Sequence, residues 1–150
     1  MSRPRCGRCQ RPLSHCLCAL IPYLPSRTRV LLLQHASEAG HALNTARLAS
    51  LGLANAQLEV GEVFEDLSRW LSDPAYRPVL LFPGEQACAL DSSMASSGKP
   101  LLLVVPDGTW RKARKLLYLN PALAELPRVH WRRSASRAIA CASAQGRCRR

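Results

Sequence analysis

The sequence predicts an α/β protein with a mostly parallel sheet and flanking helices, preceded by a small four-cysteine zinc knuckle. Short apolar runs rich in branched residues alternate with segments of helical character, which is typical of βαβ crossovers in a parallel sheet. Four of the seven cysteines fall within thirteen residues near the N-terminus. The 150 residues are enough for one core and too few for two ordinary domains plus a linker.

The cysteine cluster consists of Cys6 and Cys9, at C-x-x-C spacing, followed by Cys16 and Cys18. A thiolate pair at the first spacing can bind one tetrahedral ion from a tight turn, and Gly7 makes that turn easy. A disulfide is disfavoured in a protein that we expect to have no export signal, and iron–sulfur clusters use other spacings. We therefore expect structural Zn²⁺ on these four thiolates. Such a closed site would shape the surface without performing chemistry.

The α/β body is expected to begin with a strand and a capped helix. Residues 29–35 form an apolar run rich in branched residues, which indicates a buried strand. A loop is expected over residues 36–40. Asn44 is then a candidate cap for a helix over residues 45–51, because its side chain can accept a hydrogen bond from the first turn. Gly52 is suited to end that helix.

The second part of the body repeats the alternation. A helix is predicted over residues 62–71, followed by buried strands at 78–82 and 101–105. A further helix is predicted over residues 109–118, where Asn120-Pro121 stops it. Parallel strands joined in this way are covered by helices on both faces.

Ligands of open parallel sheets bind outside the carboxyl ends of the strands. The segments expected at those ends are Gln34–Gly40, Phe82–Glu85 and Pro106–Trp110. Two of them are Pro/Gly turns whose backbone can approach a ligand closely. The sequence therefore predicts the active site at these three turns.

Charge is unevenly distributed along the chain, whose net charge is +11. Residues 1–29 hold six Arg and no acid, and residues 111–150 hold eleven Lys or Arg against one Glu. Basic ends of this kind favour a polyanionic partner such as a nucleic acid, although a solubilising tail would have the same composition. No apolar run is long enough to span a bilayer, so we expect a cytoplasmic protein without a membrane partner.

A series of short motifs gives the sequence a more specific pattern. The turn Asp107-Gly108-Thr109-Trp110 is common when taken alone, but here it belongs to a fixed series of landmarks. The others are Cys6-x-x-Cys9-x-Arg11-Pro12, Cys16-Leu-Cys18, Asn44-Thr45-Ala46-Arg47-Leu48, Leu81-Phe82-Pro83-Gly84, Ala113-Arg114-Lys115 and Asn120-Pro121-x-Leu123. Over residues 3–128 this pattern closely resembles the DTW-domain family, the tRNA-uridine aminocarboxypropyltransferases.

The resemblance implies a SPOUT-like fold that binds S-adenosylmethionine as co-substrate. It implies transfer of the 3-amino-3-carboxypropyl group to N3 of a uridine in tRNA, with release of 5′-methylthioadenosine. The corresponding domain plan is a zinc-binding segment over residues 1–26, a DTW α/β domain over 27–128 and a basic tail over 129–150.

Asp107 is the candidate catalytic residue. Uridine N3 is protonated at neutral pH and becomes a good nucleophile only when that proton leaves. A carboxylate at a strand end, within hydrogen-bond reach, can accept the proton. The alternative roles of Asp107 are to cap the following helix or to hold the amino group or ribose of the cofactor.

Binding residues are expected at the same turns and on the following helix. The candidates for S-adenosylmethionine are Asn44, Thr45, Phe82, Pro83, Gly84, Pro106, Gly108, Thr109 and Trp110. The candidates for RNA phosphates are Arg111, Arg114 and Lys115. Each assignment has a structural alternative: a plain helix cap for Asn44, a core aromatic for Trp110 and a solvated face for the basic residues.

The pattern departs from the family after His130. Family members normally continue with an R-x-R-K-type segment and an S-T-L-E-A element that helps complete the cofactor pocket, and neither follows here. We therefore expect a truncated or frame-shifted copy that lacks part of its sheet and has impaired activity. Two other functions remain open: a SPOUT-type RNA methyltransferase and a non-catalytic, zinc-containing RNA-binding module.

Overall fold

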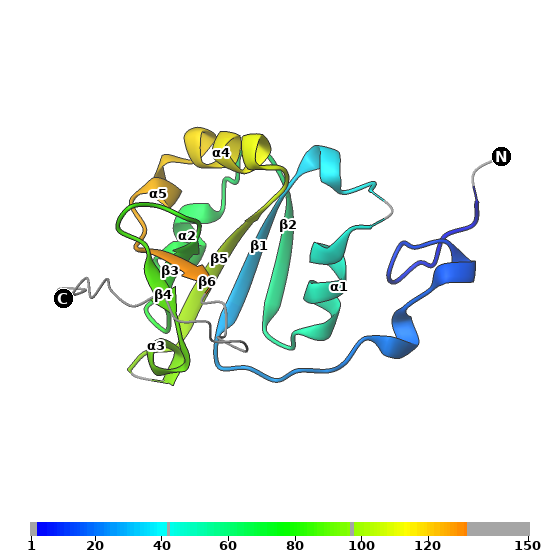
Figure 1. Cartoon of the computed structure of the whole chain (residues 1–150), viewed down its shortest axis with the longest axis horizontal. Helices are drawn as coiled ribbons and strands as arrows, with labels where there is room; N and C mark the ends of the chain where they lie inside the picture. The colour runs from blue at the N-terminus through cyan, green and yellow to red at the C-terminus, as the bar shows by residue number, and fades with distance from the viewer. Residues whose placement is uncertain (1–2, 42, 97, 132–150) are drawn as a thin grey trace, which may run out of the picture.

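Six strands form one parallel sheet in the computed structural model, which describes residues 3–41, 43–96 and 98–131. The strands are β1 Arg29–His35, β2 Ala56–Gly61, β3 Arg77–Leu81, β4 Cys88–Leu90, β5 Leu101–Asp107 and β6 Arg128–Trp131. Their order is β2-β1-β5-β3-β6-β4, and every pairing is parallel. The predicted α/β class with a parallel sheet is therefore confirmed (Figure 1).

Short helices connect the strands. They are α1 Thr45–Gly52, α2 Leu67–Leu71, α3 Ser92–Ser96, α4 Trp110–Leu119 and α5 Pro121–Ala124, with 3-10 turns at Leu13–His15, Cys18–Leu20 and Ala36–Glu38. In Figure 1, β1 and β5 run toward the end of the sheet where α4 begins, and the N-terminal segment lies beyond α1. No helix in the described part of the chain is long and apolar enough to cross a membrane.

The sheet buries apolar side chains on both faces. One cluster joins the central strands to α2, α4 and α5 and includes Leu33, Leu80, Val104, Trp70 and Leu116. A second cluster includes Val79, Leu101 and Val129. Adjacent residues of one strand belong to different clusters because successive side chains point to opposite faces. Burial on both faces explains why the central strands are continuous apolar runs.

The strand at 29–35 and the helix at 45–51 are confirmed, as are the positions of the other two predicted strands and of the helix now seen as α4. The prediction of a helix over 62–71 is wrong in its first half, because only α2 at Leu67–Leu71 is helical. The side chain of Asn120 accepts a hydrogen bond from the Phe64 N–H (3.0 Å) and donates to the Glu62 carbonyl (2.8 Å). These tertiary bonds hold the backbone of this segment in a non-helical course.

Three strands were not predicted individually. β2 is a half-buried edge strand, and β4 and β6 have three and four residues, so their patterns are short. β6 forms where the sequence indicates little strand character, because it pairs with both β3 and β4. The expected basic tail at 129–150 thus begins within a strand. Its part from residue 132 onward lies outside the described residues, so the expectation of a truncated copy with an incomplete sheet stays a prediction.

Candidate active site and metal centre

Asp107 and Gln34 lie opposite each other where β5 and β1 end. Gln34 is only 1% exposed, although its side chain is polar. Its Nε2 donates a hydrogen bond of 2.7 Å to Oδ2 of Asp107, whose carboxylate is half-buried. A buried amide therefore holds the predicted catalytic carboxylate in one orientation.

Asn44 joins the same network from the start of α1. Its Oδ1 accepts hydrogen bonds from the backbone N–H of Arg47 (3.1 Å) and from Gln34 Nε2 (2.9 Å). Its Nδ2 donates to Gln34 Oε1 (3.0 Å). Asn44 is thus a helix cap and also a partner of the residue that holds Asp107. The sequence analysis placed Gln34 in a strand-end segment but did not identify it as a site residue. A polar residue inside a buried apolar strand could have indicated such a role.

The turn after β5 is built from Gly108 and Thr109. Thr109 caps α4 by accepting a hydrogen bond from the N–H of Lys112 at 3.4 Å, so the capping role considered for Asp107 belongs to Thr109. Gly108 has φ +154°, and a Cβ there would lie 3.1 Å from the Cβ of Lys112. The backbone at this turn therefore approaches the helix more closely than a side chain would allow.

Phe82 and Trp110 bring the turn after β3 to the start of α4. Their rings meet edge to face, with centroids 5.8 Å apart and an interplanar angle of 71°. Trp110 is 64% exposed, so it is not the core aromatic that was considered as an alternative. The guanidinium of Arg128, the first residue of β6, lies 5.7 Å from the centroid of the Phe82 ring. An aromatic pair with an exposed face thus borders the predicted cofactor turns.

Two ion-pair groups border α4. Lys112 Nζ lies 2.5 Å from Glu38 Oε1, and this bond lowers the pKa of Glu38. Lys115 Nζ lies 2.8 Å from Glu62 Oε2, which likewise lowers the pKa of that carboxyl. The Nε2 of His35 lies 2.8 Å from Glu62 Oε1.

The predicted RNA-binding residues lie on the exposed surface of α4. Arg111, Arg114 and Lys115 are all exposed, and two of them, with His35 and Lys112, line a hollow of about 400 Å³. Lys115 is already paired with an acid, as described above. The expectation that these residues contact RNA stays a prediction.

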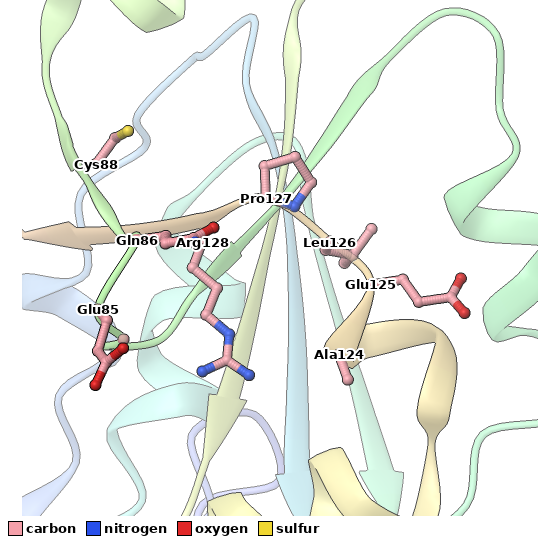
Figure 2. A pocket seen from close by; sticks show the side chains of 9 residues that line it. Glu85, Gln86, Cys88, Ala124, Glu125, Leu126, Pro127 and Arg128 are labelled. Carbon is pink, nitrogen blue, oxygen red and sulfur yellow. The ribbon is translucent and has the colours of Figure 1, made fainter. Parts of the chain in front are cut away.

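A second hollow, larger than the first, lies between residues 84–88 and 124–128. It measures about 700 Å³, within the usual range of small-molecule sites, and separates the turn after β3 from the segment before β6 (Figure 2). Of the predicted cofactor residues, Gly84 lines it. The charged side chains at its border are Glu85, Glu125 and Arg128, of which the last two were not predicted as site residues.

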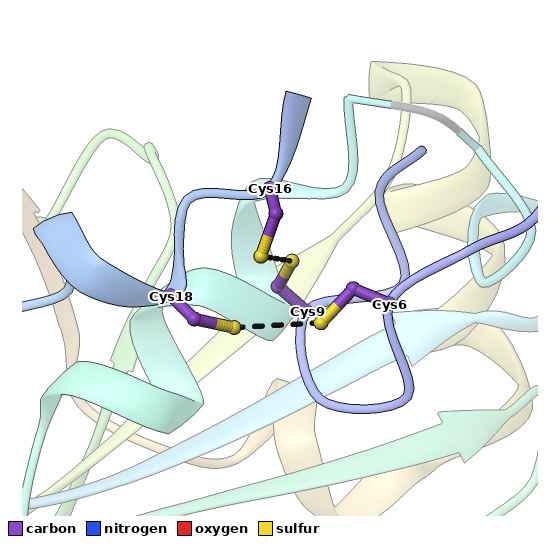
Figure 3. Close-up of side chains that lie close together, drawn as sticks. All are labelled: Cys6, Cys9, Cys16 and Cys18. Atoms are coloured by element: carbon purple, nitrogen blue, oxygen red, sulfur yellow. Dashed lines mark hydrogen bonds between the residues drawn. The ribbon is translucent and has the colours of Figure 1, made fainter. Parts of the chain in front are cut away.

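The four predicted metal ligands come together at the N-terminus (Figure 3). All four sulfur atoms lie within 4.8 Å of one another. The Cys6–Cys18 and Cys9–Cys16 sulfurs are 3.6 and 3.8 Å apart, much longer than the disulfide bond of about 2.05 Å. Tetrahedral Zn–S bonds of about 2.3 Å space the sulfurs about 3.8 Å apart. The thiol positions therefore fit one four-coordinate metal ion.

Backbone donors prepare this cluster for a cation. The N–H groups of Arg11 and Leu17 donate to the sulfur of Cys9 and lower the pKa of that thiol to about 6. Burial, reinforced by the neighbouring thiols, raises the pKa of Cys18 to about 12. Thiolate is the form that binds metal. A bound cation would offset the electrostatic repulsion among several neighbouring thiolates.

Arginine side chains connect the described part of the knuckle to the α/β body. Arg47 Nε, on α1, donates to the carbonyl of Arg8 at 3.0 Å. Arg5 Nη1 donates to the carbonyl of Gly40 at 3.4 Å. The metal-binding segment thus contacts both the loop after β1 and the helix that Asn44 caps.

Comparison with known proteins agrees with the motif pattern. The family model described as DTW domain matches residues 3–144. The chain belongs to the DTW domain family. Its cysteine knuckle, its Asn44 cap and the turn bearing Asp107 all lie within the matched region.

The curated relatives share one named activity. "tRNA-uridine aminocarboxypropyltransferase 2" of Drosophila melanogaster is 34% identical over 137 residues, covering 85% of this chain and 53% of the relative. The protein of the same name in Mus musculus is 33% identical, covering 84% and 45%. "tRNA-uridine aminocarboxypropyltransferase A" of Arabidopsis thaliana is 29% identical, covering 77% and 50%. The chain thus spans about half the length of these relatives. No solved structure matches it.

Proposed function

We propose that this chain carries the catalytic aspartate of a tRNA-uridine aminocarboxypropyltransferase. The reaction is transfer of the 3-amino-3-carboxypropyl group of S-adenosylmethionine to N3 of a uridine in tRNA. The names of the relatives support the activity and the substrate class. The observation that carries the proposal for this chain is the buried Gln34 amide bonded to Asp107 at the carboxyl edge of the sheet.

Asp107 acts as general base in this proposal. The Gln34 N–H on Oδ2 keeps the carboxylate oriented at the strand end, as a group that must receive a proton at a defined position requires. The N3 proton passes to Asp107, and the N3 electron pair forms the new bond to carbon. The exposed turn at Gly108 gives an incoming base access to this strand end.

The turns after β3 and β5 hold the cofactor. When bound, S-adenosylmethionine supplies an electrophilic Cγ, and its C–S electron pair leaves with sulfur as 5′-methylthioadenosine. The residues proposed to hold it are Asn44, Thr45, Phe82, Pro83, Gly84, Pro106, Gly108, Thr109 and Trp110. The aromatic edge of Phe82 and Trp110 and the close backbone approach at Gly108 fit a flat nucleoside against these turns.

The remaining assignments concern the metal and the RNA. Zn²⁺ on Cys6, Cys9, Cys16 and Cys18 would be structural, because four thiolates leave no open coordination position. Arg111, Arg114 and Lys115 would contact phosphates of the tRNA, in keeping with their exposure on one helix. These contacts would orient the substrate without reading its sequence.

Product analysis tests the proposal. tRNA is incubated with the protein and with S-adenosylmethionine labelled in its amino-acid part, and the nucleosides are examined by mass spectrometry. We expect a labelled uridine and 5′-methylthioadenosine, and a loss of at least about a hundredfold in Asp107→Asn, the size typical of a general base. Asp66→Asn, at an exposed position before α2, is the matched control and should keep the activity.

Other products would identify the other candidate functions. Release of S-adenosylhomocysteine would show a methyltransferase. A non-catalytic RNA-binding module is the second candidate, supported by the thiol geometry and the basic ends of the chain. In that case tRNA binding would survive Asp107→Ala and no modified nucleoside would form.

A further inference from the structure

We infer that the hollow bordered by Glu85, Glu125 and Arg128 binds the zwitterionic amino-acid part of the donor, with the Arg128 guanidinium on its carboxylate. The inference rests on the proposed function and deepens it. It assigns to these three residues the recognition of the group that is transferred.

The hollow is formed by two chain segments that the sheet brings together. Residues 84–88 follow β3, and residues 124–128 lead into β6. β3 and β6 are neighbours, with Leu81 paired to Val129, so the two segments face each other across the hollow. Its volume of about 700 Å³ is ample for an amino-acid side arm.

Arg128 is held in place before any ligand arrives. Its guanidinium lies over the Phe82 ring at 5.7 Å, and Nη1 donates to the carbonyl of Pro83 at 3.4 Å. Gly84 makes room for this arrangement, because a Cβ at that position would lie 3.0 Å from Nη1. Within the described residues no carboxylate forms an ion pair with Arg128. A planar guanidinium with unused donors suits bidentate binding of a carboxylate.

The charges around the hollow are opposite in sign to those of the donor. S-adenosylmethionine carries a sulfonium, an ammonium and one carboxylate. The hollow offers two carboxylates, on Glu85 and Glu125, and one guanidinium, on Arg128. Figure 2 shows that guanidinium between the two acidic side chains in this view. Complementary signs of this kind set the orientation of a ligand as well as its affinity.

The position also suits the reaction. β3 lies directly between β5, which ends in Asp107, and β6, which begins with Arg128. The Phe82–Trp110 contact connects the turn at the hollow to the helix that follows Asp107. Arg128 and Val104 both pair with Leu80, so the backbone of Arg128 lies two strands across from β5 and three residues short of Asp107, and its guanidinium reaches the turn after β3 by bonding the Pro83 carbonyl. Anchoring the carboxylate there would turn the transferred group toward the acceptor.

Ligand binding by calorimetry tests this inference. The probes are S-adenosylmethionine and 5′-methylthioadenosine, which lacks the amino-acid arm, and the variants are Arg128→Gln and Arg128→Lys. We expect Arg128→Gln to weaken S-adenosylmethionine binding about tenfold to a hundredfold, in line with the loss of a charged hydrogen bond. Methylthioadenosine should bind each variant as it binds the unmodified protein. Arg128→Lys should give a smaller loss, because it keeps the charge without the fork.

Arg69→Gln is the matched control, since Arg69 lies on α2 with its side chain 75% exposed and paired to Asp66. It should bind both probes normally. Unchanged S-adenosylmethionine affinity in both Arg128 variants, or an equal loss for the two probes in Arg128→Lys, would overturn the inference and leave the proposed function standing. Failure of the unmodified protein to bind S-adenosylmethionine would overturn the proposed donor, and this assignment with it.

Discussion

Gln34 fixes the orientation of the proposed catalytic carboxylate. It is a neutral donor in a buried position, and its side chain forms hydrogen bonds with Asp107 and Asn44. Its Nε2 hydrogen bond therefore holds the Asp107 carboxylate in one orientation. The arrangement leads to a prediction about charge.

We expect Gln34→Glu to place two carboxyl groups in contact, so that the pair retains a proton and its pKa rises in the folded state. A raised folded-state pKa contributes stability below the unfolded pKa, and this contribution is lost as pH rises through the folded one. The variant should therefore lose about 1–3 kcal/mol of unfolding free energy between pH 4 and pH 8 relative to the unmodified protein. Chemical denaturation at several pH values measures this.

The double variant Gln34→Glu/Asp107→Asn is the control for that experiment. It exchanges donor and acceptor, since the new amide at 107 can donate to the new carboxylate at 34. Most of the stability at pH 8 should return. If the single variant loses no unfolding free energy between pH 4 and pH 8, the contact between positions 34 and 107 does not control the protonation of the carboxyl pair.

At the scale of elements, one side chain sets the course of a connection. Asn120, at the end of α4 and 5% exposed, holds the backbone between β2 and α2 through Phe64 N and the Glu62 carbonyl. The sequence pattern of this segment favours a helix, but its backbone groups are already bonded elsewhere. Asn120 therefore specifies a tertiary contact as well as the end of a helix.

We expect Asn120→Ala to lower the unfolding free energy by about 2–4 kcal/mol, because it leaves the buried Phe64 N–H without an acceptor and removes two further bonds. Thermal or denaturant unfolding measures the change. Asn55→Ala is the comparison, since Asn55 donates one long side-chain bond of 3.4 Å to Tyr76. Equal effects in the two variants would contradict the special role of Asn120.

A second contact joins the 3-10 turn after β1 to α4 through Glu38 and Lys112, with side chains 23% and 27% exposed. The hydrogen bond from Lys112 lowers the pKa of Glu38. The stability that it provides is present above the unfolded pKa of about 4.3 and is lost as pH falls through the folded value.

Glu38→Gln should therefore cost about 0.5–1 kcal/mol at pH 7 and almost nothing below pH 3. Denaturation curves at the two pH values check this. Glu65→Gln, an exposed acid before α2, should show no such difference. A cost that persists at low pH would mean that the pair stabilises the fold by packing and not by charge.

At the scale of the whole molecule, the knuckle and the sheet are separate sources of stability. The knuckle has one buried side chain among its four ligands, whereas the sheet buries clusters on both faces. Metal binding and folding of such a segment are one event. Because Arg5 and Arg47 form hydrogen bonds between the knuckle and the body, metal binding should also stabilise the loop and helix around Asn44.

We expect Cys9→Ser to reduce bound zinc, measured by elemental analysis, and to speed amide hydrogen exchange in the first turn of α1. Amides of β1 and β5 should stay protected, because their core does not include the knuckle. Cys88→Ser, outside the cluster, should keep the metal. Loss of protection throughout the sheet would show that the metal supports the whole fold.

The sequence by itself determined the parallel α/β plan, the grouping of metal ligands and the turn that bears Asp107. These features depend on local signals, namely apolar runs, cysteine spacing and helix caps such as Asn44. Only the tertiary structure decided that Gln34 holds Asp107, that Asn120 bends the chain before α2 and that Arg128 lies beside Phe82. Each of these contacts joins residues distant in the chain, and the pairing and register of strands brought them together.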